Sequence, residues 1–283
     1  MTKLSATFYS PESSLRHPAQ MLRNMFRDLV ASRELAWRLF LRDTSAQYRQ
    51  SLFGYVWAFI PPLMASLPFV FLSSQGVMNI KGTSIPYAAY AMIGTIVWQI
   101  FVDALNTPLK IVILSKVMLA KINFPREAII LSGLGQVLFG FLIRLVLLVG
   151  IFLWFHIPPP ATVFLFPLGV LALILMGTMV GIFLTPFGLL YSDVQMTIPV
   201  FTMFLMFLTP VVYPPPTQGL AAQVMQWNPL APLMVVTRNW LTTGSMEQSG
   251  AFFLVLAATL LLLFVGWVIY RLALPHVIAR IGN

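Results

Sequence analysis

The sequence predicts an all-α integral membrane protein that crosses the bilayer about six times, with both termini on the cytoplasmic side. Of its 283 residues, 59% are hydrophobic and only 9% are charged, whereas a soluble domain carries about 25% charged residues. Its apolar segments reach the length of roughly 20 residues that one membrane span requires. The positions of the lysines and arginines then indicate the orientation.

Residues 1–50 are expected to form a cytoplasmic tail followed by an amphipathic interface helix. Residues 1–21 are polar and contain two prolines, which favours a loosely ordered tail. From Leu22 onward, apolar residues recur at helical spacing and arginines occupy the other face. A basic amphipathic helix with aromatic residues is typical of a membrane surface. We expect this helix to break at 43–45, where the chain turns toward the first span.

Residues 51–283 are expected to form a six-span permease domain. The predicted spans are 52–74, 86–106, 128–155, 162–190, 194–212 and 251–270. Three prolines in the first of them predict a kink or a break in that helix.

The basic residues indicate which side each loop faces. With the N-terminus inside, 14 of the 17 lysines and arginines lie in the N-terminal tail, in the loop 109–127 or at the C-terminus. The positive-inside rule therefore places these three regions in the cytoplasm. The net charge of +9 then reflects membrane topology, and we expect no nucleic-acid partner.

Two connections differ from simple turns. In the cytoplasmic loop, the sequence predicts a short helix over 111–124, and Pro125 forces Phe124 out of the helical region. The outer segment 213–250 is too long for a tight turn and too apolar for a solvated loop. We expect two short helices there that re-enter the membrane around prolines, because such backbone is tolerated at depth when it packs against protein. A loop lying flat on the outer leaflet is the alternative.

Two ionisable residues, Asp103 and Arg144, fall near or within predicted spans, where charged side chains are often functional. Counted from Lys110 and Glu127, they lie about 10 Å and about 25 Å from the cytoplasmic ends of their helices. We therefore expect them not to pair. Asp103 should meet cytoplasmic basic groups, and Arg144 should face the bundle interior or extend outward.

The sequence also excludes several kinds of chemistry. There is no cysteine, which excludes disulfides and thiolate metal sites. There is no Gly-Lys dipeptide, so the chain has no phosphate-binding P-loop for ATP. The three histidines are far apart, and no His/Asp or paired-acid constellation is present. We expect no catalytic residue, metal or cofactor on this chain.

Three stretches of the sequence point to one family. They are 48–62, where the basic helix enters the first span; 119–127, between spans two and three; and 191–193, followed by 208–214 and 227–230. In this order and spacing, residues 33–283 resemble the membrane subunit of ABC-type polysaccharide exporters. That family moves lipid-linked O-antigen, capsule or teichoic-acid polymers out of bacteria.

The resemblance implies a homodimer in the bacterial inner membrane, in contact with membrane lipids. It also implies two copies of a separate ABC ATPase, which would carry the ATP and Mg, and a lipid-linked polysaccharide substrate. Two alternatives remain: an ABC exporter of a small lipid or drug, and a membrane-embedded enzyme acting on a lipid.

Four groups of candidate residues follow from these expectations. Coupling to the ATPase is assigned to Lys116, Lys121, Phe124, Pro125 and Arg126. The lipid diphosphate head group is assigned to Arg38, Arg42 and Arg49, because a guanidinium binds phosphate bidentately. Aromatic rings suit the apolar faces of sugars, so the translocation path is assigned to Tyr55, Trp57, Phe59, Phe201, Phe204 and Phe207. The re-entrant segment is marked by Pro210, Tyr213, Asn228 and Pro229.

Each assignment has a simpler alternative. The lysines of the loop and the arginines of the interface helix would then only set the topology and attract anionic lipids. The aromatic residues would only pack in the bundle or face lipid.

Overall fold

The computed structural model describes residues 18–49, 52–76, 83–121, 124–216 and 218–281, and all regular elements in these ranges are helices. Four of them are long and apolar enough to cross a membrane: α3 (Tyr87–Leu114), α5 (Glu127–Trp154), α6 (Phe166–Leu190) with the preceding η3 (Ala161–Leu165), and α10 (Ser249–Ile281). Two apolar helices are shorter, namely α2 (Ile60–Ser74) and α7 (Ser192–Leu208). The prediction of an all-α membrane fold class is thus confirmed.

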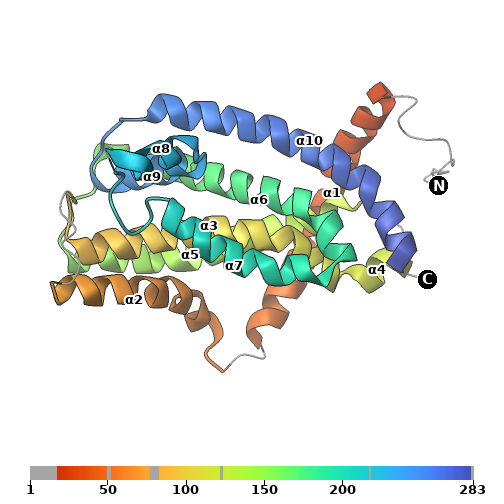
Figure 1. Ribbon diagram of the computed structural model, residues 1–283. Helices are drawn as coiled ribbons and strands as arrows, with labels where there is room; N and C mark the ends of the chain where they lie inside the picture. Colours follow the sequence, from red (N-terminus) through yellow and green to blue (C-terminus); the bar gives the residue numbers. More distant parts are fainter. Residues whose placement is uncertain (1–17, 50–51, 77–82, 122–123, 217, 282–283) are drawn as a thin grey trace.

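The long helices run side by side, and α3 lies at the centre of the bundle (Figure 1). It packs against α2, α5, α6 and α9 (Leu230–Thr242). The approach to α6 is very close. A Cβ on Gly177 would lie 2.6 Å from one carbonyl oxygen of α3, and a Cβ on Gly181 would lie 2.4 Å from another. Small residues allow such close packing of membrane helices.

The helix predicted over 52–74 is interrupted before α2 rather than within it. A 3₁₀ helix, η2 (Gly54–Ala58), precedes α2, so the predicted path residues Tyr55 and Trp57 lie outside the apolar helix. The prolines at the start of α2 occupy the first helical turn. Backbone N–H groups have no partner within the helix at these positions, so the N–H that proline lacks costs no hydrogen bond. The 15 residues of α2 span about 22 Å, which is less than the 30 Å or so of a hydrocarbon core.

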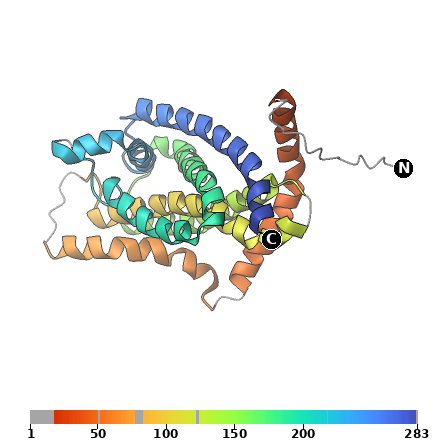
Figure 2. The same ribbon diagram turned by 45° about the vertical axis from the view of Figure 1, so that its right-hand side comes forward.

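The interface helix α1 (Pro18–Arg49) is continuous and crosses the end of the bundle at a steep angle, as both views show (Figures 1 and 2). The expected break at 43–45 is therefore wrong. Asp43 pairs with Arg42 at 2.7 Å, and Phe40 packs on α5 at Gly135 and Phe139, so tertiary contact maintains the helix. The helix also starts earlier than predicted, and residues 1–17 of the expected tail lie outside the described ranges.

The connection between α3 and α5 differs in its bounds from the predicted helix over 111–124. Ile111 and Val112 are buried and extend α3 to Leu114. A separate helix, α4 (Lys116–Lys121), follows. Phe124 and Pro125 are not helical, as the proline predicts.

The outer segment contains α8 (Gly219–Trp227) and α9, at the opposite end of the bundle from α1 and α4 (Figure 1). The two helices differ in burial. Leu233, Met234 and Val236 of α9 are fully buried, whereas Leu220 and Trp227 of α8 are more than 80% exposed. One helix is therefore part of the bundle and the other lies on its surface.

Candidate functional site

Arg144 and Asp103 form a buried ion pair in the middle of the bundle. Their side chains approach to 2.6 Å, and the Arg144 side chain is only 7% exposed. The Nε of Arg144 also donates to the carbonyl oxygen of Ala58, at 3.1 Å. One arginine thereby joins α5, α3 and the C-terminal end of η2.

The expectation that these two residues lie at different heights is wrong for two reasons. Helix α3 continues to Leu114, so Asp103 lies about 16 Å from the C-terminal end of its helix rather than the roughly 10 Å counted from Lys110. In addition, α3 and α5 are consecutive helices that run in opposite directions, and side chains lean toward the N-terminus of their own helix. Asp103 and Arg144 therefore lean toward each other.

A polar pocket of about 210 Å³ surrounds this ion pair. Asp103 also accepts a hydrogen bond from the Gln99 amide, at 2.9 Å. The pocket is lined from α1, η2, α3 and α5 by Gln47, Trp57, Ala58, Asp103, Asn106, Thr107, Lys110, Gln136, Val137, Gly140 and Arg144. The predicted path residue Trp57 thus lies beside polar groups.

The six predicted path aromatics do not form one cluster. Phe207 of α7 contacts Phe69 of α2, with ring centroids 6.2 Å apart. Tyr55 instead packs against Phe139 of α5, and Phe59 is half-buried at the start of α2. Each of the three α7 phenylalanines is about half exposed or more, which leaves them on an uncovered side of that helix.

Helices α2 and α7 both carry such an uncovered apolar side. On α2 it consists of Met64, Leu67, Phe71 and Leu72, and on α7 of Met196, Val200, Phe201, Met203, Phe204 and Phe207. Only Ile198, Thr202 and Met206 of α7 are buried.

The three predicted head-group arginines share one face of α1. Because the helix is continuous through Arg49, a rotation of 100° per residue places Arg38, Arg42 and Arg49 within about 40° of one another. Arg38 pairs with Glu34 at 2.6 Å, and both side chains are about three-quarters exposed. Arg42 pairs with Asp43, and Arg49 is exposed.

The predicted coupling residues lie at a junction of helices. Met118, Leu119 and Phe124 pack against a buried cluster to which α1 contributes Ala36 and Leu39 and α10 contributes Tyr270 and Leu274. Lys116 is exposed, while Pro125 and Arg126 are half-buried just before α5. The side chain of Lys121 lies outside what the structure describes.

A second ion-pair network, which the sequence did not reveal, lies near this junction. Arg271 of α10 contacts Asp28 of α1 at 2.6 Å and Glu127 of α5 at 2.8 Å. Residues far apart in the sequence supply the three groups, so only the tertiary structure brings them together.

At the end of the bundle that carries α8 and α9, the predicted marker residues hold the chain between α7 and α9. The Asn228 amide donates to the Leu208 carbonyl and to Thr209 Oγ1. The Tyr213 hydroxyl donates to the Phe207 carbonyl at 2.6 Å. Burial raises the pKa of the Tyr213 phenol, which keeps the hydroxyl protonated and able to donate. Pro210 lies in the irregular stretch, and Pro229 immediately precedes α9.

Arg238 of α9 is a structural residue that the sequence patterns did not single out. It is 2% exposed, and its guanidinium stacks 3.9 Å from the centroid of the Tyr90 ring. One nitrogen donates to the carbonyl oxygens of Pro210 and Val211, both at 3.0 Å. An arginine within an otherwise apolar segment was the available signal.

Comparison with known proteins identifies the family. Residues 34–241 match the ABC-2 type transporter family. The O-antigen export system permease protein RfbA of Klebsiella pneumoniae is 24% identical over 212 residues, which cover 73% of this chain and 79% of that protein. The protein of the same name from Myxococcus xanthus is 25% identical over 213 residues, covering 74% and 81%. Because the family match covers most of its length, this chain is a member of the ABC-2 type transporter family of membrane proteins.

Proposed function

We propose that this chain is the membrane subunit of an ATP-driven exporter that moves a lipid-linked polysaccharide across the bacterial inner membrane. The observation that carries the proposal is the uncovered apolar side of α2 and α7, where Phe201, Phe204 and Phe207 are 48–63% exposed. The family match and the O-antigen export permeases among its relatives support the transport role and the class of substrate.

The uncovered side suits a path between two copies of the chain. Two short helices with one unpacked face each cannot bury that face within one subunit, so a homodimer meeting around α2 and α7 would enclose it. Aromatic rings offer broad, weakly polar contacts to the faces of sugars. Such contacts would hold a sliding polymer without fixing it in place.

Cysteine labelling tests the path, because the natural chain contains no cysteine. Single cysteines at Phe201, Phe204 and Phe207 should react with a water-soluble thiol reagent during active export. Matched controls are Leu254 and Leu261 of α10, which are more exposed than the three phenylalanines in the isolated chain but would face lipid. Equal reactivity at both sets, or reaction at none of the path positions, contradicts the proposal.

ATP hydrolysis is proposed to occur on two copies of a partner ATPase, with α4 and its flanks as the docking element. Lys116 is exposed, while Met118 and Phe124 pack against a buried cluster to which α1, α3, α5, α6 and α10 contribute. Because α4 contacts α10 and α3, a displacement of α4 would be passed to those two helices. Reversing Lys116 and Lys121 to glutamate should stop export while the protein still inserts, and the matched change of both to arginine should preserve it. Normal export by the glutamate variant would exclude this element.

The basic face of α1 is the proposed binding site for the lipid diphosphate. Arg38, Arg42 and Arg49 would present planar guanidinium groups that lysine cannot reproduce. The changes Arg42→Lys and Arg49→Lys together should reduce export and substrate-stimulated ATPase activity. Arg33→Lys, an equally exposed change on another face of α1, should not. If the double variant exports normally, these arginines only set the topology.

An exporter of a small lipid or drug is the second candidate. The polar pocket around Asp103 and Arg144 is the observation that favours it, since a small polar head group would fit 210 Å³ and a polymer would not. Substitution of Gln136 by leucine would impair a small-lipid exporter and leave polymer export unchanged.

A further inference from the structure

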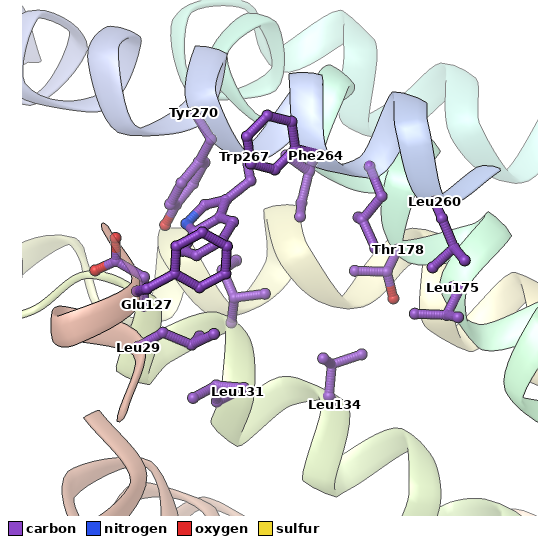
Figure 3. A pocket seen from close by; sticks show the side chains of 14 residues that line it. Leu29, Glu127, Leu131, Leu134, Leu175, Thr178, Leu260, Phe264, Trp267 and Tyr270 are labelled. Carbon is purple, nitrogen blue, oxygen red and sulfur yellow. The ribbon is translucent and has the colours of Figure 1, made fainter. Parts of the chain in front are cut away.

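Four helices enclose an apolar pocket of about 250 Å³ on the cytoplasmic half of the bundle. It is lined from α1, α5, α6 and α10 (Figure 3), and no described residue of α2 or α7 lines it. Leu131 and Leu134 of α5, Leu175 of α6 and Leu260 of α10 form much of its wall. Phe264 of α10, which also lines it, is 38% exposed, so the pocket opens at the surface of the bundle.

The dimensions of the pocket match one leaflet. From Glu127 to Leu134 it follows α5 for about 10 Å, and from Leu260 to Tyr270 it follows α10 for about 15 Å. Half of a hydrocarbon core of about 30 Å is about 15 Å. Apolar cavities of about 150 Å³ stay dry and take up hydrocarbon, and the hydrocarbon available at this depth is a lipid chain.

One polar group at the cytoplasmic end of the pocket needs a partner. The Tyr270 hydroxyl is buried and makes no hydrogen bond within the part of the chain that the structure describes. Figure 3 shows this hydroxyl on the same side as the Glu127 carboxylate, with Leu134, Leu175 and Leu260 on the other side of the pocket. Buried hydroxyl groups are rarely left unpaired, and the ester carbonyl of a glycerolipid is an acceptor suited to this position.

The charges beside Tyr270 distinguish between possible lipids. Arg271 pairs with both Asp28 and Glu127, and Arg126 is a further positive charge acting on Tyr270, so these four groups carry no net charge. A rim without net charge suits a head group that itself carries no net charge, whereas a diphosphate would add uncompensated negative charge. The rim also ties α1 to α10, where Phe26 meets Trp267 with ring centroids 5.5 Å apart.

We propose that this pocket binds one acyl chain of a zwitterionic inner-leaflet phospholipid of the phosphatidylethanolamine class. The ester carbonyl of that lipid accepts a hydrogen bond from the Tyr270 hydroxyl. The lipid fills the gap behind α1 and stabilises its position across the bundle. The site lies apart from the proposed polymer path and from the basic face of α1, so the inference does not depend on the exported substrate.

Native mass spectrometry of the full-length chain in mild detergent tests the proposal, with extraction and identification of the bound lipid. The natural protein should retain phosphatidylethanolamine. After delipidation, it should bind added palmitoyl-oleoyl phosphatidylethanolamine more tightly than the matching phosphatidylglycerol or a polyprenyl phosphate. Preferential binding of the polyprenyl phosphate would overturn the proposal and assign the pocket to a carrier chain.

Two variants separate the site from general lipid contact. Tyr270→Phe keeps the ring and removes one hydrogen bond of about 1 kcal/mol, so the dissociation constant of the lipid should rise about fivefold. Leu134→Phe with Leu175→Phe should fill the pocket and abolish specific retention. The matched double change Leu142→Phe with Leu261→Phe lies at exposed positions on α5 and α10 outside the pocket and should retain the lipid. Equal retention by Tyr270→Phe, the filled variant and the control overturns the proposal.

Discussion

The middle of the bundle and its outer end each bury an arginine, and the two side chains are satisfied by different partners. In the middle, Arg144 pairs with the Asp103 carboxylate and contacts one backbone carbonyl. At the outer end, Arg238 contacts two backbone carbonyls and the face of Tyr90, and no ion pair joins it to a carboxylate in the described part of the chain.

The difference follows from the backbone around each arginine. Residues within a regular helix have carbonyls that are already bonded, so Arg144, which lies between long helices, needs an anion. The chain after α7 is irregular from Thr209 to Tyr213, which leaves carbonyl oxygens free to accept. Gly94 of α3 allows this stretch to approach closely, since a Cβ there would lie 2.0 Å from the Val211 oxygen. An irregular stretch of backbone thus provides the hydrogen-bond acceptors that a regular helix lacks.

The largest effect is expected at Arg238. Arg238→Met would leave the Pro210 and Val211 carbonyls buried and unpaired, and we expect a loss of roughly 4 kcal/mol in stability. The thermal unfolding midpoint in detergent measures it, with the exposed Arg33→Met as control. An unchanged midpoint would mean that water replaces the guanidinium and that the outer end is not held by this residue.

A somewhat smaller effect is expected for the ion pair in the middle. Asp103→Asn leaves a buried cation without its anion and should cost roughly 3 kcal/mol. The double variant Asp103→Leu with Arg144→Met removes both charges and should be more stable than Asp103→Asn alone. A double variant that is no more stable than Asp103→Asn would show that the two charges do not depend on each other.

Two variants of Tyr90 sharpen the comparison by separating its ring from its hydroxyl. Tyr90→Phe loses the hydrogen bond to the Tyr213 carbonyl, worth about 1 kcal/mol, and retains the ring beneath Arg238. Tyr90→Leu also removes the cation–π contact and should cost about 1 kcal/mol more. The same thermal measurement distinguishes them, and equal losses would assign no role to the ring.

The smallest effect is expected at the exposed pair Arg38–Glu34. Both side chains are mostly in solvent, so Arg38→Gln should change stability by less than about 1 kcal/mol. Any defect in export by this variant would then report on ligand binding rather than on folding. A stability loss as large as that of Asp103→Asn would contradict the assignment of Arg38 to a solvated face.

The sequence by itself determined the class of fold, the positions of the long apolar helices and the amphipathic nature of α1, because hydrophobic length and periodicity are local properties. It also located the outer segment as unusual, through its prolines and apolar content. It placed the ends of α1, α2 and α4 wrongly. Packing of Phe40 against α5 accompanies the continuation of α1, and Ile111 is buried as part of α3 rather than of the connecting helix.

Only the tertiary structure decided which charged residues meet. The lean of side chains on antiparallel helices brings Asp103 to Arg144, and the crossing of α1 over the bundle brings Asp28 to Arg271 and Glu127. A count of residues along one helix contains neither the direction of its neighbour nor the angle of crossing. For the same reason the apolar pocket behind α1, with Tyr270 at its cytoplasmic end, could not be read from any single segment.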